Sequence, residues 1–77
     1  MSQAKITIVK LNREKIIIEN AAITTDPTRA EIMLITALAL NNLTSNDIKI
    51  AEYTIDGNHV FGYLRQADGL HTLTPAK

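Results

Sequence analysis

The sequence predicts a single α+β domain in which one α-helix packs on a mostly antiparallel sheet, in the order ββαββ or ββαβββ. Segments rich in β-branched residues occur in pairs, with a short polar turn between the members of each pair. One helix-forming segment with a clear start signal separates the two pairs. Local hairpins on both sides of a single helix favour a sheet with the helix on one face, and 77 residues suffice for one domain, 1–77.

The first hairpin is predicted from two strands at about residues 4–11 and 15–23. In the first of them Ile6 and Ile8 fall on one face, and Lys5, Thr7 and Val9 fall on the other. Asn12-Arg13-Glu14 supplies the polar turn between the strands. These two segments are therefore expected to pair as neighbours.

The second strand carries three consecutive isoleucines, Ile16 to Ile18. Side chains of a strand alternate between its faces, so this run places apolar groups on both faces and is typical of a strand buried on two sides. Lys15 and Glu19 flank the run. Charged residues in such positions discourage aggregation through a strand edge.

The helix is predicted over about residues 27–42. Asp26 is a suitable N-cap, because its carboxylate can accept hydrogen bonds from free N–H groups of the first turn. Pro27 suits the first helical position, where no N–H partner is needed. Asn41 or Asn42 can adopt the left-handed conformation that closes a helix.

Apolar residues surround the predicted helix instead of gathering on one side. Ala30, Met33, Ala37 and Leu40 form one stripe, Ile32, Ile35, Ala39 and Leu43 form another, and Leu34 and Leu38 fall on a third side. One sheet covers about a third to a half of a helix circumference, so a second surface is expected to cover the rest. We expect an interface at Leu34 and Leu38, together with Ile35 and Thr36.

The second half of the chain predicts strands at about 48–55 and 59–66, and a shorter one at 70–74. Asp56-Gly57 between the first two is a strong signal for a two-residue hairpin turn. Residues 44–47 are predicted to be a linker. Thr44 and Asp47 could instead form a capping box that opens a short helix, but the alternation after Ile48 favours a strand.

Composition narrows the classes of function. Lys plus Arg and Asp plus Glu number eight each and are dispersed, which gives no electrostatic footprint for duplex DNA or a membrane surface. The chain has no cysteine, no nucleotide-binding glycine pattern and no targeting segment, so we expect no metal, no cofactor, no membrane contact and a cytoplasmic location. A core of this size rarely supplies more than about 3–5 kcal/mol, which favours association with another chain.

Two histidines are the candidates for proton chemistry. His59 lies close in sequence to Asp56, with which it can form a hydrogen bond, and His71 lies close to Asp68. Neither has a nucleophile nearby in the sequence, because cysteine is absent and the only serines are Ser2 and Ser45. We therefore predict no catalytic residue.

The three aromatic residues all fall in the third and fourth strands. Phe61, Tyr63 and Arg65 alternate, so they share one face of the sheet. On an open face, such rings beside an arginine form a stacking platform for single-stranded nucleic acid. On a covered face, they belong to the core or to an interface, and the sequence leaves this choice open.

The function expected from these observations is that of a small non-catalytic protein–protein interaction module. It would be homodimeric through the apolar helix surface, with a second copy or another protein as its partner. A regulatory or accessory role fits its size and composition, as in small phage or mobile-element proteins. The alternative is a single-stranded nucleic-acid-binding protein that uses Phe61, Tyr63 and Arg65.

Overall fold

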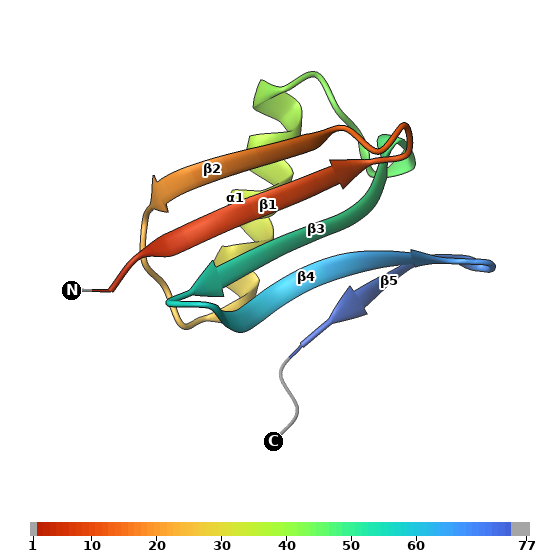
Figure 1. Cartoon of the computed structure of the whole chain (residues 1–77). Helices are drawn as coiled ribbons and strands as arrows, with labels where there is room; N and C mark the ends of the chain where they lie inside the picture. The colour runs from red at the N-terminus through yellow and green to blue at the C-terminus, as the bar shows by residue number, and fades with distance from the viewer. Residues whose placement is uncertain (1, 75–77) are drawn as a thin grey trace.

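The chain forms a five-stranded antiparallel sheet with one α-helix on one face (Figure 1). The computed structural model describes residues 2–74. Its elements are β1 (Ala4–Lys10), β2 (Lys15–Ala21), α1 (Pro27–Leu40), the 3₁₀ turn η1 (Ser45–Asp47), β3 (Ile48–Ile55), β4 (Asn58–Gln66) and β5 (Gly69–Leu73). The predicted α+β class is confirmed, and the longer of the two predicted orders, ββαβββ, is the one observed.

The strand order across the sheet is β2-β1-β3-β4-β5, so β2 and β5 form the two edges. Three of the four strand pairs are local hairpins, and β1–β3 is the single pairing that joins the two halves of the chain. The turn between β3 and β4 has positive φ at both central residues, 52° at Asp56 and 84° at Gly57. This is the type I′ geometry that the Asp-Gly pair predicts.

The helix begins and ends where the sequence indicates. The Asp26 side chain accepts a hydrogen bond of 3.1 Å from the N–H of Thr28, and Pro27 occupies the first turn. Asn42 has a φ of 58°, and the N–H of Leu43 donates to the carbonyl of Leu38 at 2.8 Å. Asn42 thus closes the helix in the left-handed conformation.

The segment before β3 is not a plain linker. Ser45–Asp47 forms one 3₁₀ turn, in which the Thr44 hydroxyl accepts from the N–H of Asn46 and the Asp47 carboxylate accepts from the N–H of Thr44. The hydrogen bond from Thr44 lowers the pKa of Asp47. The capping box that Thr44 and Asp47 could form is therefore present. It opens only one 3₁₀ turn and no longer helix, because the strand residues of β3 follow directly.

The core lies between α1 and the helix-facing side of the sheet. Its buried helix residues are Ala30, Leu34, Ala37 and Leu38, and its buried sheet residues include Ala4, Ile6, Ile8, Ile48, Ala51, Tyr53 and Phe61. Leu34 and Leu38, predicted to form an exposed interface, thus face the sheet. The prediction was wrong because a helix that is apolar all round has no unique inner side on a helical wheel.

Strand β2 is also placed differently from the prediction. The run Ile16–Ile18 suggested a strand covered on both faces, whereas β2 is an edge strand and the Ile17 side chain is 50% exposed. Ile16 and Ile18 are half-buried on the helix-facing side. The helix makes its main sheet contacts with β3 and β4, so it covers β2 incompletely.

Tyr53 joins the sheet to the segment that leads into the helix. Its ring is fully buried at the centre of β3, and its hydroxyl donates to the Ala22 carbonyl at 2.6 Å and accepts from the N–H of Thr24 at 3.0 Å. The Thr24 hydroxyl in turn accepts from the N–H of the cap residue Asp26. The start of α1 is therefore held at a set position relative to β3.

We expect Leu34→Ala to lower the free energy of unfolding by about 2–5 kcal/mol, because it opens a cavity in the core. Leu40→Ala removes a side chain that is 80% exposed and should change stability by no more than about 0.5 kcal/mol. Urea denaturation at low protein concentration measures both. Equal losses for the two variants would contradict the observed orientation of the helix.

We expect Tyr53→Phe to cost about 1–3 kcal/mol, because it removes both hydrogen bonds to the segment before α1. Tyr63→Phe is the matched control, since its hydroxyl bonds only to a side chain at the edge of the helix. Denaturation curves give the two stabilities, and hydrogen exchange at Thr24 should accelerate in the first variant alone. A Tyr53→Phe protein as stable as the wild type would show that this anchor is not required.

Candidate protein-binding surface

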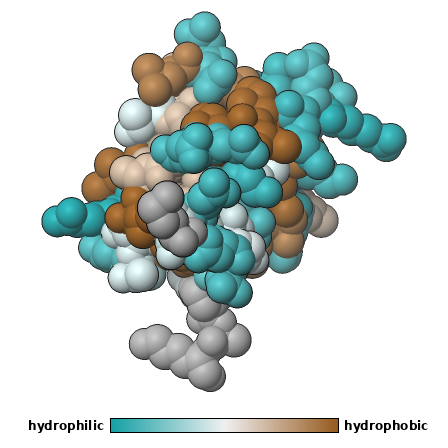
Figure 2. Space-filling model, turned by 60° about the vertical axis from the view of Figure 1, so that its left-hand side comes forward, coloured by the Kyte–Doolittle hydropathy of each residue, from teal (hydrophilic) through white to brown (hydrophobic). Residues whose placement is uncertain are grey.

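Only one of the three most exposed apolar residues of the helix, Ile35, belongs to the predicted interface. Leu40 is 80% exposed, Ile32 is 59% exposed and Ile35 is 52% exposed. Leu40 and Ile35 lie on the two flanks of the buried stripe, and Ile32 lies on the outer side of α1 between them. Figure 2, in which the left-hand side of Figure 1 comes forward, shows apolar patches separated by polar side chains on that face. The exposed apolar surface is therefore divided into separate parts.

One part is an apolar groove between α1 and the edge strand β2, which we call the β2-side groove. It has a volume of about 290 Å³. Its lining residues are Ile6, Ile18, Ala21, Ala22, Ile32, Met33, Thr36, Ala37 and Leu40. The hydroxyl of Thr36 donates to the Ile32 carbonyl at 2.8 Å, so the one polar side chain of the lining already has a partner. The groove offers contact area to an apolar group.

A second groove, the β4-side groove, lies on the opposite flank of the helix. It has a volume of about 450 Å³ and is lined by Ile35, Leu38, Ala39, Leu43, Thr44, Ser45 and Tyr63. The hydroxyl of Tyr63 donates to the Glu31 carboxylate at 2.6 Å. Burial, together with this carboxylate, raises the pKa of Tyr63. Tyr63 therefore acts as a neutral wall of the groove and braces β4 against α1.

The predicted interface residues separate into two groups in the structure. Leu34 and Leu38 are buried, whereas Ile35 and Thr36 are exposed and lie on opposite flanks of the helix. Ile32 and Leu40 were missed, because they fall in different stripes of the helix and only the structure places both along one groove. Side-chain size offered a signal for the inner stripe, because Ala30 and Ala37 let the helix approach the sheet closely.

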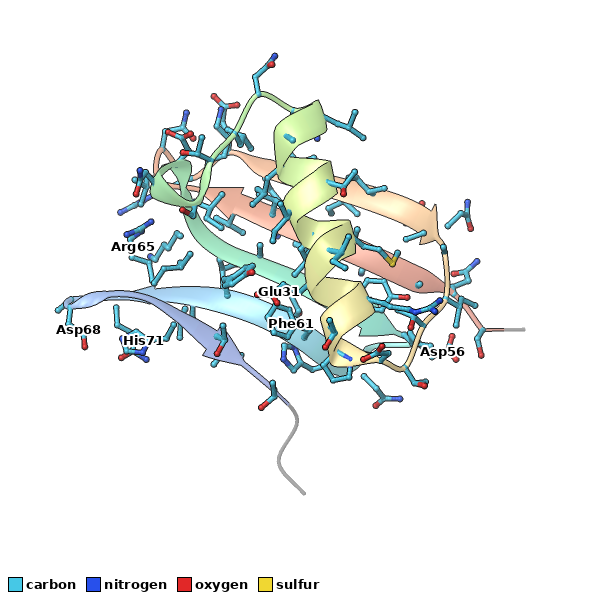
Figure 3. The ribbon with its side chains drawn as sticks, turned by 180° about the vertical axis from the view of Figure 1, so that it is seen from behind. Glu31, Asp56, Phe61, Arg65, Asp68 and His71 are labelled. Carbon is cyan, nitrogen blue, oxygen red and sulfur yellow. The ribbon has the colours of Figure 1, made fainter. Side chains whose placement is uncertain are left out.

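The aromatic residues do not form an exposed stacking platform. Phe61 and Tyr63 share a face as predicted, with ring centroids 5.2 Å apart in an edge-to-face arrangement, but α1 covers that face. Figure 3 shows Phe61 beneath the first turns of the helix, close to Glu31. Phe61 is buried, and the guanidinium of Arg65 donates to the Ile48 carbonyl at 2.9 Å. The predicted nucleic-acid residues thus belong to the core and to a brace between β3 and β4.

The face of the sheet opposite the helix carries a polar bridge over β4. His59 places Nδ1 2.9 Å from the Glu52 carboxylate and Nε2 2.9 Å from the Leu73 carbonyl. The predicted partner, Asp56, instead accepts a hydrogen bond from the N–H of Gln3. Both partners of His59 are acceptors, so the doubly protonated ring can donate to both, whereas a neutral ring can donate to only one. The bridge links β3, β4 and β5.

The second histidine lies at the hairpin between β4 and β5, far from the helix (Figure 3). The Nε2 atom of His71 is 2.6 Å from the Asp68 carboxylate, as the sequence suggested, and this contact lowers the pKa of Asp68. Among residues 2–74 neither histidine bonds to a serine or threonine hydroxyl. Within the same range, no group of three or more acidic or histidine side chains is placed to hold a metal ion.

Gly62 provides the space for the His59 ring. A Cβ atom at this position would lie 2.7 Å from the Ala51 carbonyl oxygen and 3.0 Å from Cε1 of His59. We expect Gly62→Ala to destabilise the fold by about 1–3 kcal/mol through this overpacking, measured by urea denaturation.

The double variant His59→Ala, Gly62→Ala separates the two contacts of the added methyl group. It removes the ring but not the backbone oxygen of Ala51, so it should remain less stable than His59→Ala alone. A Gly62→Ala protein with wild-type stability would contradict this packing.

No helix formed by residues 2–74 is long and apolar enough to cross a membrane. Comparisons of the chain with protein-family models, with curated proteins and with solved structures each find no match.

Proposed function

We propose that the chain is a non-catalytic protein–protein interaction module that forms a homodimer through the β2-side groove, in a regulatory or accessory role. The observation that carries this proposal is the exposure of Ile32 and Leu40, which both line one groove whose side chains are mostly apolar. Scattered exposed apolar residues are ordinary on protein surfaces, but these two share one concave surface with Met33 and Ile18.

Association needs more apolar contact than Ile32 and Leu40 of one chain supply. Full burial of an exposed Ile or Leu side chain contributes about 1.5–3 kcal/mol, whereas association costs about 4–15 kcal/mol. Two such residues together contribute about 3–6 kcal/mol, which reaches only the lower end of that cost. A two-fold axis buries each contact twice, so Ile32 and Leu40 of two copies act together.

The polar clusters support a binding role over a catalytic one. His59 uses both ring nitrogens in contacts within the sheet, and His71 contacts Asp68 on the exposed β4–β5 hairpin. Neither histidine lines either groove beside the helix. The concave apolar surfaces and the groups suited to proton transfer are thus in different places.

Sedimentation velocity tests the proposal. The wild-type protein should be a dimer at high micromolar concentration, and Ile32→Glu or Leu40→Glu should shift it to monomer, because each places a charge in the apolar contact. Ile35→Glu is the matched control, since Ile35 has similar exposure to Ile32 but lines the β4-side groove instead of the β2-side groove.

A wild-type protein that remains monomeric at this concentration would overturn the proposed homodimer. A dimer lost in Ile35→Glu but retained in Ile32→Glu would assign the contact to the β4-side groove instead.

A further inference from the structure

Within residues 2–74, no strand pairs with the outer edge of β2, whose backbone groups can therefore pair with another chain. The N–H of Lys10 donates to the Glu14 carbonyl at 2.8 Å, and hydrogen-bonded and non-hydrogen-bonded pairs alternate along an antiparallel ladder. Lys10 faces Glu14, so every second pair from there is hydrogen-bonded, namely Ile8 with Ile16 and Ile6 with Ile18. The backbone groups of Ile16 and Ile18 therefore bond to β1. The backbone groups of Lys15, Ile17 and Glu19 point to the open edge.

The flanking charges, Lys15 and Glu19, oppose edge pairing in registers that bring like charges together, but they are self-complementary about Ile17. The strand reads Lys-Ile-Ile-Ile-Glu from residue 15 to residue 19, so its charges are opposite and equally distant from the central isoleucine. An antiparallel copy centred on Ile17 places Lys15 of each copy opposite Glu19 of the other copy. It also places Ile17 opposite itself and Ile16 opposite Ile18 of the second copy.

We infer that two copies of this chain join β2 to β2 in antiparallel orientation, with the two-fold axis at Ile17. The inference rests on the proposed homodimer and specifies its contact. The residues that meet, Ile17 with itself and Lys15 with Glu19, are those whose N–H and C=O groups face the edge. Each pair is therefore a hydrogen-bonded pair, and the two sheets become one continuous sheet.

This arrangement also brings the two β2-side grooves together. The two-fold axis that relates antiparallel edge strands is perpendicular to the sheet, so both helices lie on the same face. In Figure 1 the C-terminal end of α1 passes behind β2 and extends beyond that edge, so the last turns of the two helices come close to the axis. Leu40 lies in the last turn, and the nearby second copy accounts for its exposure in one chain.

Charge disfavours registers shifted by four residues, and backbone geometry limits the length of the segment that can pair. A slip of the second copy by four residues in either direction places Lys15 opposite Lys15 or Glu19 opposite Glu19, and like charges directly opposite are destabilising. Asn20, with a φ of 59°, interrupts the ladder beyond Glu19, and the hairpin turn precedes Lys15. The straight edge is therefore limited to the self-complementary segment.

A charge-reversal series tests the pairing. Lys15→Glu and Glu19→Lys should each raise the dimer dissociation constant by about tenfold or more, because each creates two like-charge pairs across the axis. The double variant Lys15→Glu, Glu19→Lys restores opposite charges and should return the constant to near the wild-type value. Circular dichroism confirms that each variant is folded.

Disulfide trapping provides a second measurement, because the chain has no native cysteine. Facing residues of a hydrogen-bonded pair have Cα atoms about 5.5 Å apart, which a disulfide can bridge. Ile17→Cys should therefore form a covalent dimer under mild oxidation. Ile35→Cys, with nearly equal exposure, should not.

The outcomes separate this inference from the proposed function. A wild-type dimer that is lost in Ile32→Glu, but is insensitive to the charge series and not trapped by Ile17→Cys, would overturn the edge pairing and leave the homodimer intact. A monomeric wild-type protein would overturn both. Charge rescue together with trapping at Ile17 would support the inference.

Discussion

The buried hydroxyl of Tyr53 joins the centre of the sheet to the segment that leads into the helix. This group holds the segment that follows β2 through the Ala22 carbonyl and the N–H of Thr24, just before the helix cap at Asp26. The helix begins on the β4 side of the sheet, where Glu31 accepts from the Tyr63 hydroxyl, and it packs mainly on β3 and β4. Its last turns reach β2, whose helix-facing side remains partly open (Figure 1). The β2-side groove lies beside these later turns.

The two faces of the sheet consequently differ in character. The helix-facing side buries the core and continues into the apolar groove at β2. The other side carries the Glu52–His59–Leu73 bridge over Gly62, which ties the last strand to the sheet through polar contacts. Ile17 is an exception on that open side, since it is a half-exposed isoleucine at the edge. Apolar surface on both sides of β2 therefore gathers at one edge of the molecule.

Local signals predicted most of the fold, because the elements that they define need only a few neighbouring residues. Asp26, Pro27 and Asn42 set the ends of the helix, and Asp56-Gly57 set a hairpin turn, through backbone preferences that act within one turn. The candidate surface was predicted less well. Leu34 and Leu38 were expected outside the core, and Phe61 and Tyr63 were left open between core and solvent, because these choices depend on which helix side meets the sheet.

The sequence by itself determined the class of the fold, the order of its elements and the tendency of an all-round apolar helix to exceed what one sheet can cover. Only the tertiary structure decided the sheet order, the edge position of β2 and the inner stripe of the helix. The β1–β3 pairing and the Tyr53 contact join residues far apart in the chain, and no local pattern encodes them. The periodicity of the sequence predicts which residues share one face of a helix or strand. The packing of the whole domain decides what that face contacts.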